Sequence, residues 1–137
     1  MTLTYEITKD AMRGYVEQTW GTWDEAEQIE KHRQNYRPAS HKIVLIEDKA
    51  AGLVAVETEP EYLWLVKLYL LSEHRGKGIG TELLRQVLDQ AKQARKRVRL
   101  RVLRVNPKAQ ALYLRHGFEI VEETEERLFM HTPASGA

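Results

Sequence analysis

The chain has 137 residues, of which 42% are hydrophobic and 30% charged, the composition of an ordinary globular domain. Its 21 basic and 20 acidic residues nearly balance, which argues against a nucleic-acid-binding protein. The absence of cysteine excludes a disulfide framework, a thiolate metal site and a cysteine nucleophile. No signal peptide or membrane-length apolar run is visible, so we expect a cytoplasmic protein without membrane contact. We expect one domain over residues 1–132 and a disordered tail over 133–137.

The N-terminal third predicts one strand and two helices. Leu3–Thr8 alternates apolar and polar residues, which predicts a first strand, and Asp10 could cap a helix that follows it. A second helix starts at Thr22 or Asp24 and runs to about Tyr36. It is mostly polar. The tryptophans at positions 20 and 23, before it, either support the core or line an acceptor site.

Three strands are predicted next. Lys42–Glu47 and Leu53–Glu59 form a hairpin through the connection Asp48–Gly52. Tyr62–Leu71 is almost wholly apolar apart from Lys67, which is typical of a central strand covered on both faces.

A glycine-rich loop separates this strand from an amphipathic helix. Glycines stand at positions 76, 78 and 80, interleaved with Arg75 and Lys77. Glycine allows main-chain N–H groups to converge on an anion, and the start of the helix adds unpaired N–H groups and its positive dipole end. The loop therefore predicts a phosphate site, although a ligand-free tight turn would also use glycine.

Two common phosphate-binding patterns do not fit this loop. The P-loop needs Gly-Lys-Ser/Thr, whereas Gly80 is followed by Thr81 and Glu82. The dinucleotide pattern G-x-G-x-x-G, started at Gly76, needs a glycine where Thr81 stands.

The C-terminal half predicts a basic strand, a short helix and a final strand pair. The run Arg95–Arg101 is either a solvated edge or a surface for nucleic acid or an acidic partner, and Val98–Leu103, which overlaps it, is a half-buried strand. Asn106 caps a helix over Pro107–His116, and the last strands are 118–123 and 127–131. The predicted fold is α/β, in the order β-α-α-β-β-β-α-β-α-β-β, with a mixed sheet and helices on both faces.

Two motifs identify a family that the chain resembles. Arg75-x-x-Gly78-x-Gly80 matches the Arg/Gln-x-x-Gly-x-Gly/Ala signature of the GNAT superfamily of acyl-CoA-dependent N-acetyltransferases. The stretch from Asn106 to Phe118 is similar to its second motif, Asn-x-x-Ala-x-x-Leu-Tyr-x-x-x-Gly-Phe. The resemblance covers nearly the whole chain, although residues 1–37 match only in their element pattern.

The resemblance implies an acetyl-CoA site and no metal. The arm of the cofactor would enter where the strand before the loop splays from the next strand. Asn106 would contact the pantetheine region, and Tyr113, a phenol of ordinary pKa about 10, would protonate the departing thiolate. The implied cofactor-binding residues are Leu68, Tyr69, Leu70, Arg75, Gly76, Lys77, Gly78, Ile79, Gly80, Thr81, Asn106 and Tyr113.

The general base is the least defined part of the implied site. Some family members carry a glutamate at the position of Trp64 here, and others carry one at the position of Arg101. Glu57 and Glu59 are the remaining candidates, with Glu25 and His41 further from the motifs. Proximity catalysis with water as the proton acceptor is the alternative.

The expected activity is direct acetyl transfer from acetyl-CoA to a primary amine of a small molecule, with Trp20, Trp23 and Glu25 near the acceptor. The polar second helix and the acids Glu57, Glu59 and Glu61 favour a cationic acceptor. The alternatives are a protein or peptide amino group as acceptor, or a CoA-binding module with weak catalysis. The final strands offer an edge for pairing in a homodimer.

Overall fold

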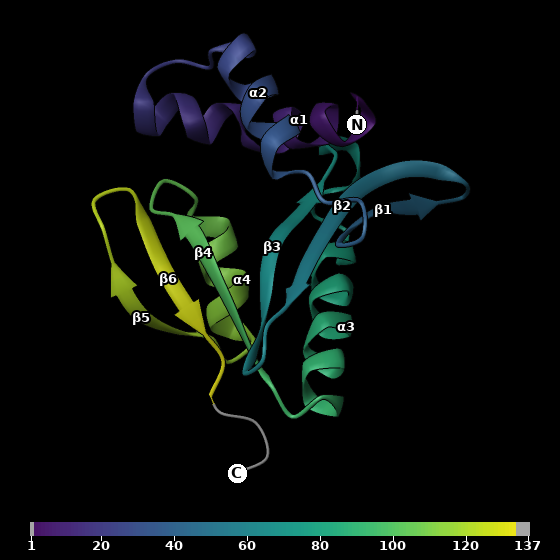
Figure 1. Ribbon diagram of the computed structural model, residues 1–137, viewed down its shortest axis with the longest axis vertical. Coiled ribbons are helices and arrows are strands. Elements are labelled where there is room, and N and C mark those ends of the chain that lie inside the picture. The colour runs from purple at the N-terminus through teal and green to yellow at the C-terminus, as the bar shows by residue number, and fades with distance from the viewer. Residues whose placement is uncertain (1, 134–137) are drawn as a thin grey trace.

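The computed structural model describes residues 2–133, so residues 134–137 of the tail expected at 133–137 lie outside them (Figure 1). The helices are α1 (Thr2–Trp20), α2 (Glu25–Asn35), α3 (Ile79–Gln93) and α4 (Pro107–Arg115). The strands are β1 (His41–Ile46), β2 (Lys49–Thr58), β3 (Tyr62–Leu70), β4 (Arg97–Leu103), β5 (Glu119–Glu123) and β6 (Arg127–His131). None of the helices in this part of the chain combines the length and apolar character needed to cross a membrane.

The predicted first strand is wrong, because Leu3–Thr8 forms the first turns of α1. Residues that line one side of this helix, Tyr5, Thr8, Met12 and Tyr15, are three and four positions apart, which is helical spacing. The short alternation at the N-terminus fits both periods, and packing of Tyr5 and Ile7 decides for the helix.

The second helix begins at Glu25, which agrees with the later of its two predicted starts, Asp24, and not with Thr22. The carboxylate of Asp24, rather than the Thr22 hydroxyl, caps α2 by accepting from the Glu27 amide at 3.0 Å. The first hairpin is also tighter than expected, because Glu47 and Asp48 both adopt positive φ and the strands continue up to them.

The six strands form one mixed sheet in the order β1-β2-β3-β4-β6-β5. All neighbours are antiparallel except β3 and β4, which α3 joins as a crossover. In Figure 1, α3 and α4 lie behind the sheet, and α1 and α2 lie across the end to which β3 and β4 point. The mixed α/β architecture confirms the predicted fold class.

The core lies between the sheet and the face covered by α3 and α4. Leu84 and Val87 of α3 pack there against strand residues that are 8% exposed or less. The buried cluster contains Leu63, Leu65, Leu84, Val87, Ala91, Val98, Leu100, Val102, Tyr113, Phe118, Leu128 and Met130.

The parallel pair β3–β4 separates partway along its length. Their paired residues are Tyr62–Arg97, Leu63–Val98 and Trp64–Arg99, and the pairing stops there. The remainder of β3 therefore has one edge bonded to β2 and the other edge without a strand partner. The predicted splayed pair is confirmed.

A β-bulge in β3 decides which side chains face the opening. Opposite Ala55–Val56 of β2, β3 carries one extra residue, Val66, between Leu65 and Lys67. Leu65 belongs to the core, whereas Lys67 and Tyr69 line the cavity on the side of α1 and α2.

Candidate functional site

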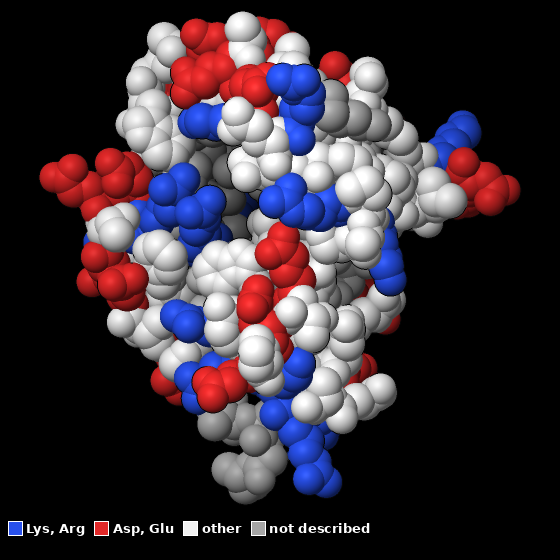
Figure 2. Space-filling model, in the orientation of Figure 1, with Lys and Arg blue, Asp and Glu red and all other residues white. Residues whose placement is uncertain are grey.

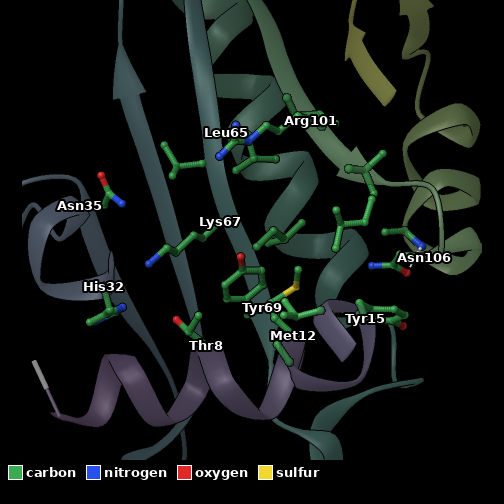
Figure 3. Close-up of a pocket in the computed structure, with 18 of the residues that line it drawn as sticks. Thr8, Met12, Tyr15, His32, Asn35, Leu65, Lys67, Tyr69, Arg101 and Asn106 are labelled. Atoms are coloured by element: carbon green, nitrogen blue, oxygen red, sulfur yellow. Dashed lines mark hydrogen bonds between the residues drawn. The ribbon is translucent and has the colours of Figure 1, made fainter. Parts of the chain in front are cut away.

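A cavity of ≈ 670 Å³ occupies the region where β3 and β4 separate. Side chains of α1 and α2 close it from one side, and the exposed edge of β3, β4 and the start of α4 form the rest. Figure 3 shows Lys67 and Tyr69 of β3 reaching into it, opposite Thr8 and Met12 of α1 and His32 and Asn35 of α2.

The glycine loop presents main-chain donors at the start of α3. Gly76 and Gly78 have φ of 75° and 81°, a conformation that side chains with a Cβ rarely adopt, and Gly78 is the N-cap. Within residues 2–133, no amide from Gly76 to Thr81 donates a main-chain hydrogen bond. These free N–H groups and the dipole of a 15-residue helix form an anion site.

Arg75 fixes the loop against α1. Its Nε donates to the Leu70 carbonyl at 2.9 Å, and its Nη2 lies 2.9 Å from the Asp10 carboxylate. The main-chain amide and hydroxyl of Ser72 donate to the same carboxylate, each at 3.1 Å. Asp10 therefore does not cap a helix, as the sequence suggested, but joins α1 to the segment before the glycine loop.

The strand residues expected to contact the acyl arm lie at the unpaired edge. Leu68, Tyr69 and Leu70 are bonded to β2 and lie beyond the last β3–β4 pair. Across the cavity, Asn106 caps α4 by accepting from the Ala109 amide at 3.2 Å, as predicted. That contact uses the carbonyl oxygen of its side chain and leaves the amide nitrogen for another acceptor.

Tyr113 of α4 lines the cavity and is 8% exposed. Its hydroxyl has no hydrogen-bond partner among residues 2–133, and burial, with the nearby phenol of Tyr69, raises its pKa. Burial also raises the pKa of Tyr69 to about 12. Both phenols are therefore protonated at neutral pH and able to donate a hydrogen bond.

The two tryptophans line the cavity, but the glutamate predicted beside them does not. Trp23 Nε1 donates to Glu25 at 2.8 Å, and Lys9 forms an ion pair with the same carboxylate at 3.0 Å. Glu25 therefore lies outside the cavity and holds the Trp23 ring through this hydrogen bond. Trp20 is 50% exposed, with the Arg127 guanidinium 5.3 Å from its ring centroid.

The structure separates the candidate bases. Glu57 lines the cavity, as do Trp64 and Arg101, whereas Glu59 and Glu61 do not. His41 is buried away from the cavity with Nδ1 2.8 Å from the Arg37 carbonyl, and burial lowers its pKa.

Several cavity residues were not predicted from the sequence. Burial lowers the pKa of Lys67 to about 8 and that of His32 to about 4, so His32 is neutral near pH 7. The Nε2 atom of His32 lies 2.8 Å from the Thr4 hydroxyl. A single charged residue within an apolar strand was the signal for Lys67, whereas Arg127 and His32 had none in the sequence.

Among residues 2–133, no three His, Asp or Glu side chains are grouped so that they could hold a metal ion.

Comparison with known proteins finds solved structures of similar fold and a protein-family model that matches this chain. The model described as "Acetyltransferase (GNAT) family" matches residues 4–118. Comparison with curated proteins by sequence gave no significant match.

Three solved structures are similar over most of their length. The PaiA N-acetyltransferase from Thermoplasma acidophilum, in complex with coenzyme A, is 18% identical with a TM-score of 0.75, covering 93% of this chain and 89% of that one. The ribosomal-protein-S18-alanine N-acetyltransferase from Escherichia coli is 19% identical with a TM-score of 0.73, covering 97% and 86%. Naa50 from Arabidopsis thaliana, in complex with the bisubstrate analogue CoA-Ac-MVNAL, is 20% identical with a TM-score of 0.63, covering 80% and 94%.

Proposed function

This chain belongs to the GNAT acetyltransferase family, and from that premise we propose that it transfers the acetyl group of acetyl-CoA to a primary amine of a small molecule. The observation that carries the proposal is the row of free amides from Gly76 to Thr81, which follows the end of β3 whose outer edge has no strand partner among the described residues. An anion site beside an open strand edge suits a cofactor with a pyrophosphate and an amide-rich arm.

The residues present fit acetyl-CoA in two places. The amides of Gly76–Thr81 would hold the pyrophosphate, with Lys77 exposed beside them. The main chain of Leu68–Leu70 and the side-chain nitrogen of Asn106 would bind the pantetheine arm. Arg75 would act indirectly, because its guanidinium is already bonded to Asp10 and Leu70.

Acetyl-CoA supplies an acetyl group activated as a thioester. In the transfer, the amine nitrogen forms the new bond to the carbonyl carbon, the C–S bond breaks, and the amine loses one proton while the sulfur gains one. Tyr113 would donate a hydrogen bond to the leaving sulfur. Its raised pKa keeps the phenol protonated, so it can stabilise the developing thiolate throughout bond breaking.

Glu57 is the proposed proton acceptor. It is the carboxylate that lines the cavity, whereas Glu59 points elsewhere and its main-chain carbonyl accepts from Lys96 at 2.8 Å. An alkylammonium of ordinary pKa about 10 must lose its proton before it can attack, so a base or a water chain to Glu57 is needed.

Release of CoA from acetyl-CoA in the presence of an amine panel tests the proposal. The panel contains amino acids, polyamines, amino sugars and peptides, because two of the similar structures carry a peptide analogue or a ribosomal protein in their names. We expect turnover with one class of small amine. Turnover with peptides alone would support the protein-acetylating alternative, and tight CoA binding without any turnover would support a CoA-binding module.

Tyr113→Phe tests the proposed role of the phenol. We expect the turnover number to fall by roughly 100-fold, because positioned proton donors contribute about that much, with unchanged affinity for acetyl-CoA. Tyr62→Phe is a matched control, since Tyr62 does not line the cavity and its ring contacts Arg99. Wild-type turnover in Tyr113→Phe would remove Tyr113 as the donor.

A further inference from the structure

The cavity wall carries many more cations than acids. Among its lining residues, one carboxylate, Glu57, stands against six basic side chains. These are Lys31, Arg37, Lys67, Arg75, Arg101 and Arg127. Figure 2 shows basic side chains on both sides of a hollow in this face of the molecule. The excess is a local property, because the chain as a whole is nearly neutral.

Two of the six cations are already neutralised by protein carboxylates. Lys31 pairs with Glu27 at 3.2 Å, and Arg75 pairs with Asp10 at 2.9 Å. The other four form no ion pair within residues 2–133. Arg37 is exposed, and its guanidinium donates to the Gln34 carbonyl at 3.0 Å. Lys67, Arg101 and Arg127 are left as cations that line the cavity without an ion-pair partner in the part of the chain that the structure describes.

Lys67 and Arg101 stand on the two strands that separate. The last β3–β4 pair is Trp64–Arg99, and Lys67 and Arg101 follow it by three and two residues respectively. Both therefore flank the opening just beyond the point where the strands part. Figure 3 shows Lys67 directed toward His32 and Asn35 of α2, so its ammonium lies on the side of the cavity covered by α1 and α2.

Arg101 and Arg127 form a like-charged pair on neighbouring strands. Arg127 faces Leu103 in the β4–β6 ladder, two residues from Arg101. Burial lowers the pKa of Arg127, the charge of Arg101 lowers it further, and Glu126 acts in the opposite direction. Like charges at such positions destabilise a sheet unless an anion lies between them. The ring of Trp20 covers the Arg127 guanidinium and limits its access to solvent on that side.

The remaining polar groups of this wall cannot supply the missing negative charge. His32 and Tyr69 are neutral near pH 7, and Asn35 carries no charge. An uncompensated cation that is partly buried costs free energy, and an anionic ligand would recover it. Guanidinium groups also bind carboxylate and phosphate in a matching fork geometry.

We propose that the acceptor amine carries an acidic group, a carboxylate or a phosphate, which Lys67, Arg101 and Arg127 bind while the amine faces the acetyl group. The proposal rests on the acetyltransferase function proposed above and names the substrate class for the same cavity. It reverses the cationic acceptor expected from Glu57, Glu59 and Glu61, because two of those three acids lie outside the cavity.

Matched acceptors that differ in one charge test the proposal. Each pair consists of an amino acid and its carboxamide, with aminoalkyl phosphates and their alcohols as a second arm that separates carboxylate from phosphate. We expect the acidic member to have a kcat/KM at least tenfold higher in one arm. Equal values within every pair would overturn the proposal while leaving acetyl transfer itself intact.

Binding without turnover provides a second readout. Titration calorimetry in the presence of CoA compares an N-acetylated amino acid with its carboxamide, so the result does not depend on an active acceptor having been found. We expect the acid to bind at least tenfold more tightly. If the acid and the amide bind equally, the cavity does not select an anion and the proposal fails.

Charge-removing variants assign the selectivity to this wall. Lys67→Gln and Arg101→Gln should each reduce the acid-to-amide ratio by about tenfold, with the Kd for acetyl-CoA unchanged. Arg99→Gln is the matched control, because Arg99 stacks on Tyr62 outside the cavity, and it should keep the wild-type ratio. A loss of acetyl-CoA affinity with an unchanged ratio would assign these cations to the cofactor and overturn the proposal.

Discussion

The two proposed halves of the site offer different groups to a ligand. On the proposed cofactor side, the glycine loop offers main-chain amides, whose positions are fixed by the backbone and by the start of α3. On the proposed acceptor side, the cavity wall consists of side chains from α1, α2, β3, β4 and β6, and three of them are cations without an ion pair among residues 2–133. Main-chain recognition depends on glycine at particular positions, whereas side-chain recognition can change with one substitution. The two halves should therefore respond to different mutations.

Gly78→Asp should break the cofactor half alone and have the largest effect. Position 78 has φ of 81°, and a carboxylate there would stand at the anion site in front of α3. We expect the Kd for CoA to rise by at least about 100-fold and the CoA-induced increase in melting temperature to disappear. Calorimetry and thermal melting measure both quantities.

Two control variants separate charge from strain at this position. Gly78→Ala carries the conformational cost without the charge and should lose less affinity. Gly14→Asp adds a carboxylate at an exposed glycine of α1 and should leave CoA binding unchanged. A wild-type melting shift in Gly78→Asp would remove the proposed pyrophosphate site.

Asp10→Ala should affect both halves, because Asp10 joins α1 to Ser72 and Arg75. Without these contacts, α1, which lines the cavity, is no longer held to the segment before the glycine loop. We expect about a tenfold fall in kcat/KM for the acceptor, since misplacement of reacting groups reduces the rate strongly, together with a smaller rise in the Kd for CoA.

Asp89→Ala is the control for this variant. Asp89 is exposed on α3 with no ion pair among the described residues, so its removal should change neither constant. If Asp10→Ala changes only one of the two constants, the contacts around Asp10 do not couple the halves.

A rise in pH should weaken the acceptor half alone and have the smallest effect. The pKa of Lys67 is about 8, so its ammonium is charged below that pH and loses its proton above it. We expect the Kd of an N-acetylated amino acid to rise roughly threefold between pH 7 and 9, because one of three cations is lost. CoA affinity in the glycine loop should not follow the same profile.

The groups around Lys67 leave it as the titrating residue in this range. His32 has a pKa of about 4 and Tyr69 of about 12, so neither changes its charge between pH 7 and 9. His41 is also neutral, because burial lowers its pKa. Lys67→Gln should therefore flatten the profile, and an unchanged profile in that variant would contradict the assignment.

The sequence predicted the elements whose signals are local. The apolar run of β3, the glycines before α3 and the Asn106-Pro107 start of α4 each specify their own conformation, and all three lie where they were expected. Leu3–Thr8 was misassigned because six residues can satisfy a period of two and a helical period equally well. Its state depends on packing that the alternation does not encode.

The acceptor wall could not be predicted in the same way. Arg101 and Arg127 come from strands that become neighbours only in the sheet, and the sequence placed Arg101 within an ordinary basic edge. Glu25 illustrates the opposite error, since a carboxylate beside Trp23 in the chain lies behind the ring rather than in the cavity. Residue type and spacing define main-chain sites well, but sites built from distant side chains depend on register.

Register within β3 rests on a single inserted residue. If the strand ran through Val66 without the bulge, strict alternation from Leu65 would turn position 67 onto the side occupied by α3 and would place an ammonium among leucine and valine side chains. The phenol two positions later would turn with it. The identity of this wall is therefore set by the bulge as much as by residue type, and a chain with the same residues but no bulge here would present a different lysine-to-tyrosine arrangement to the cavity.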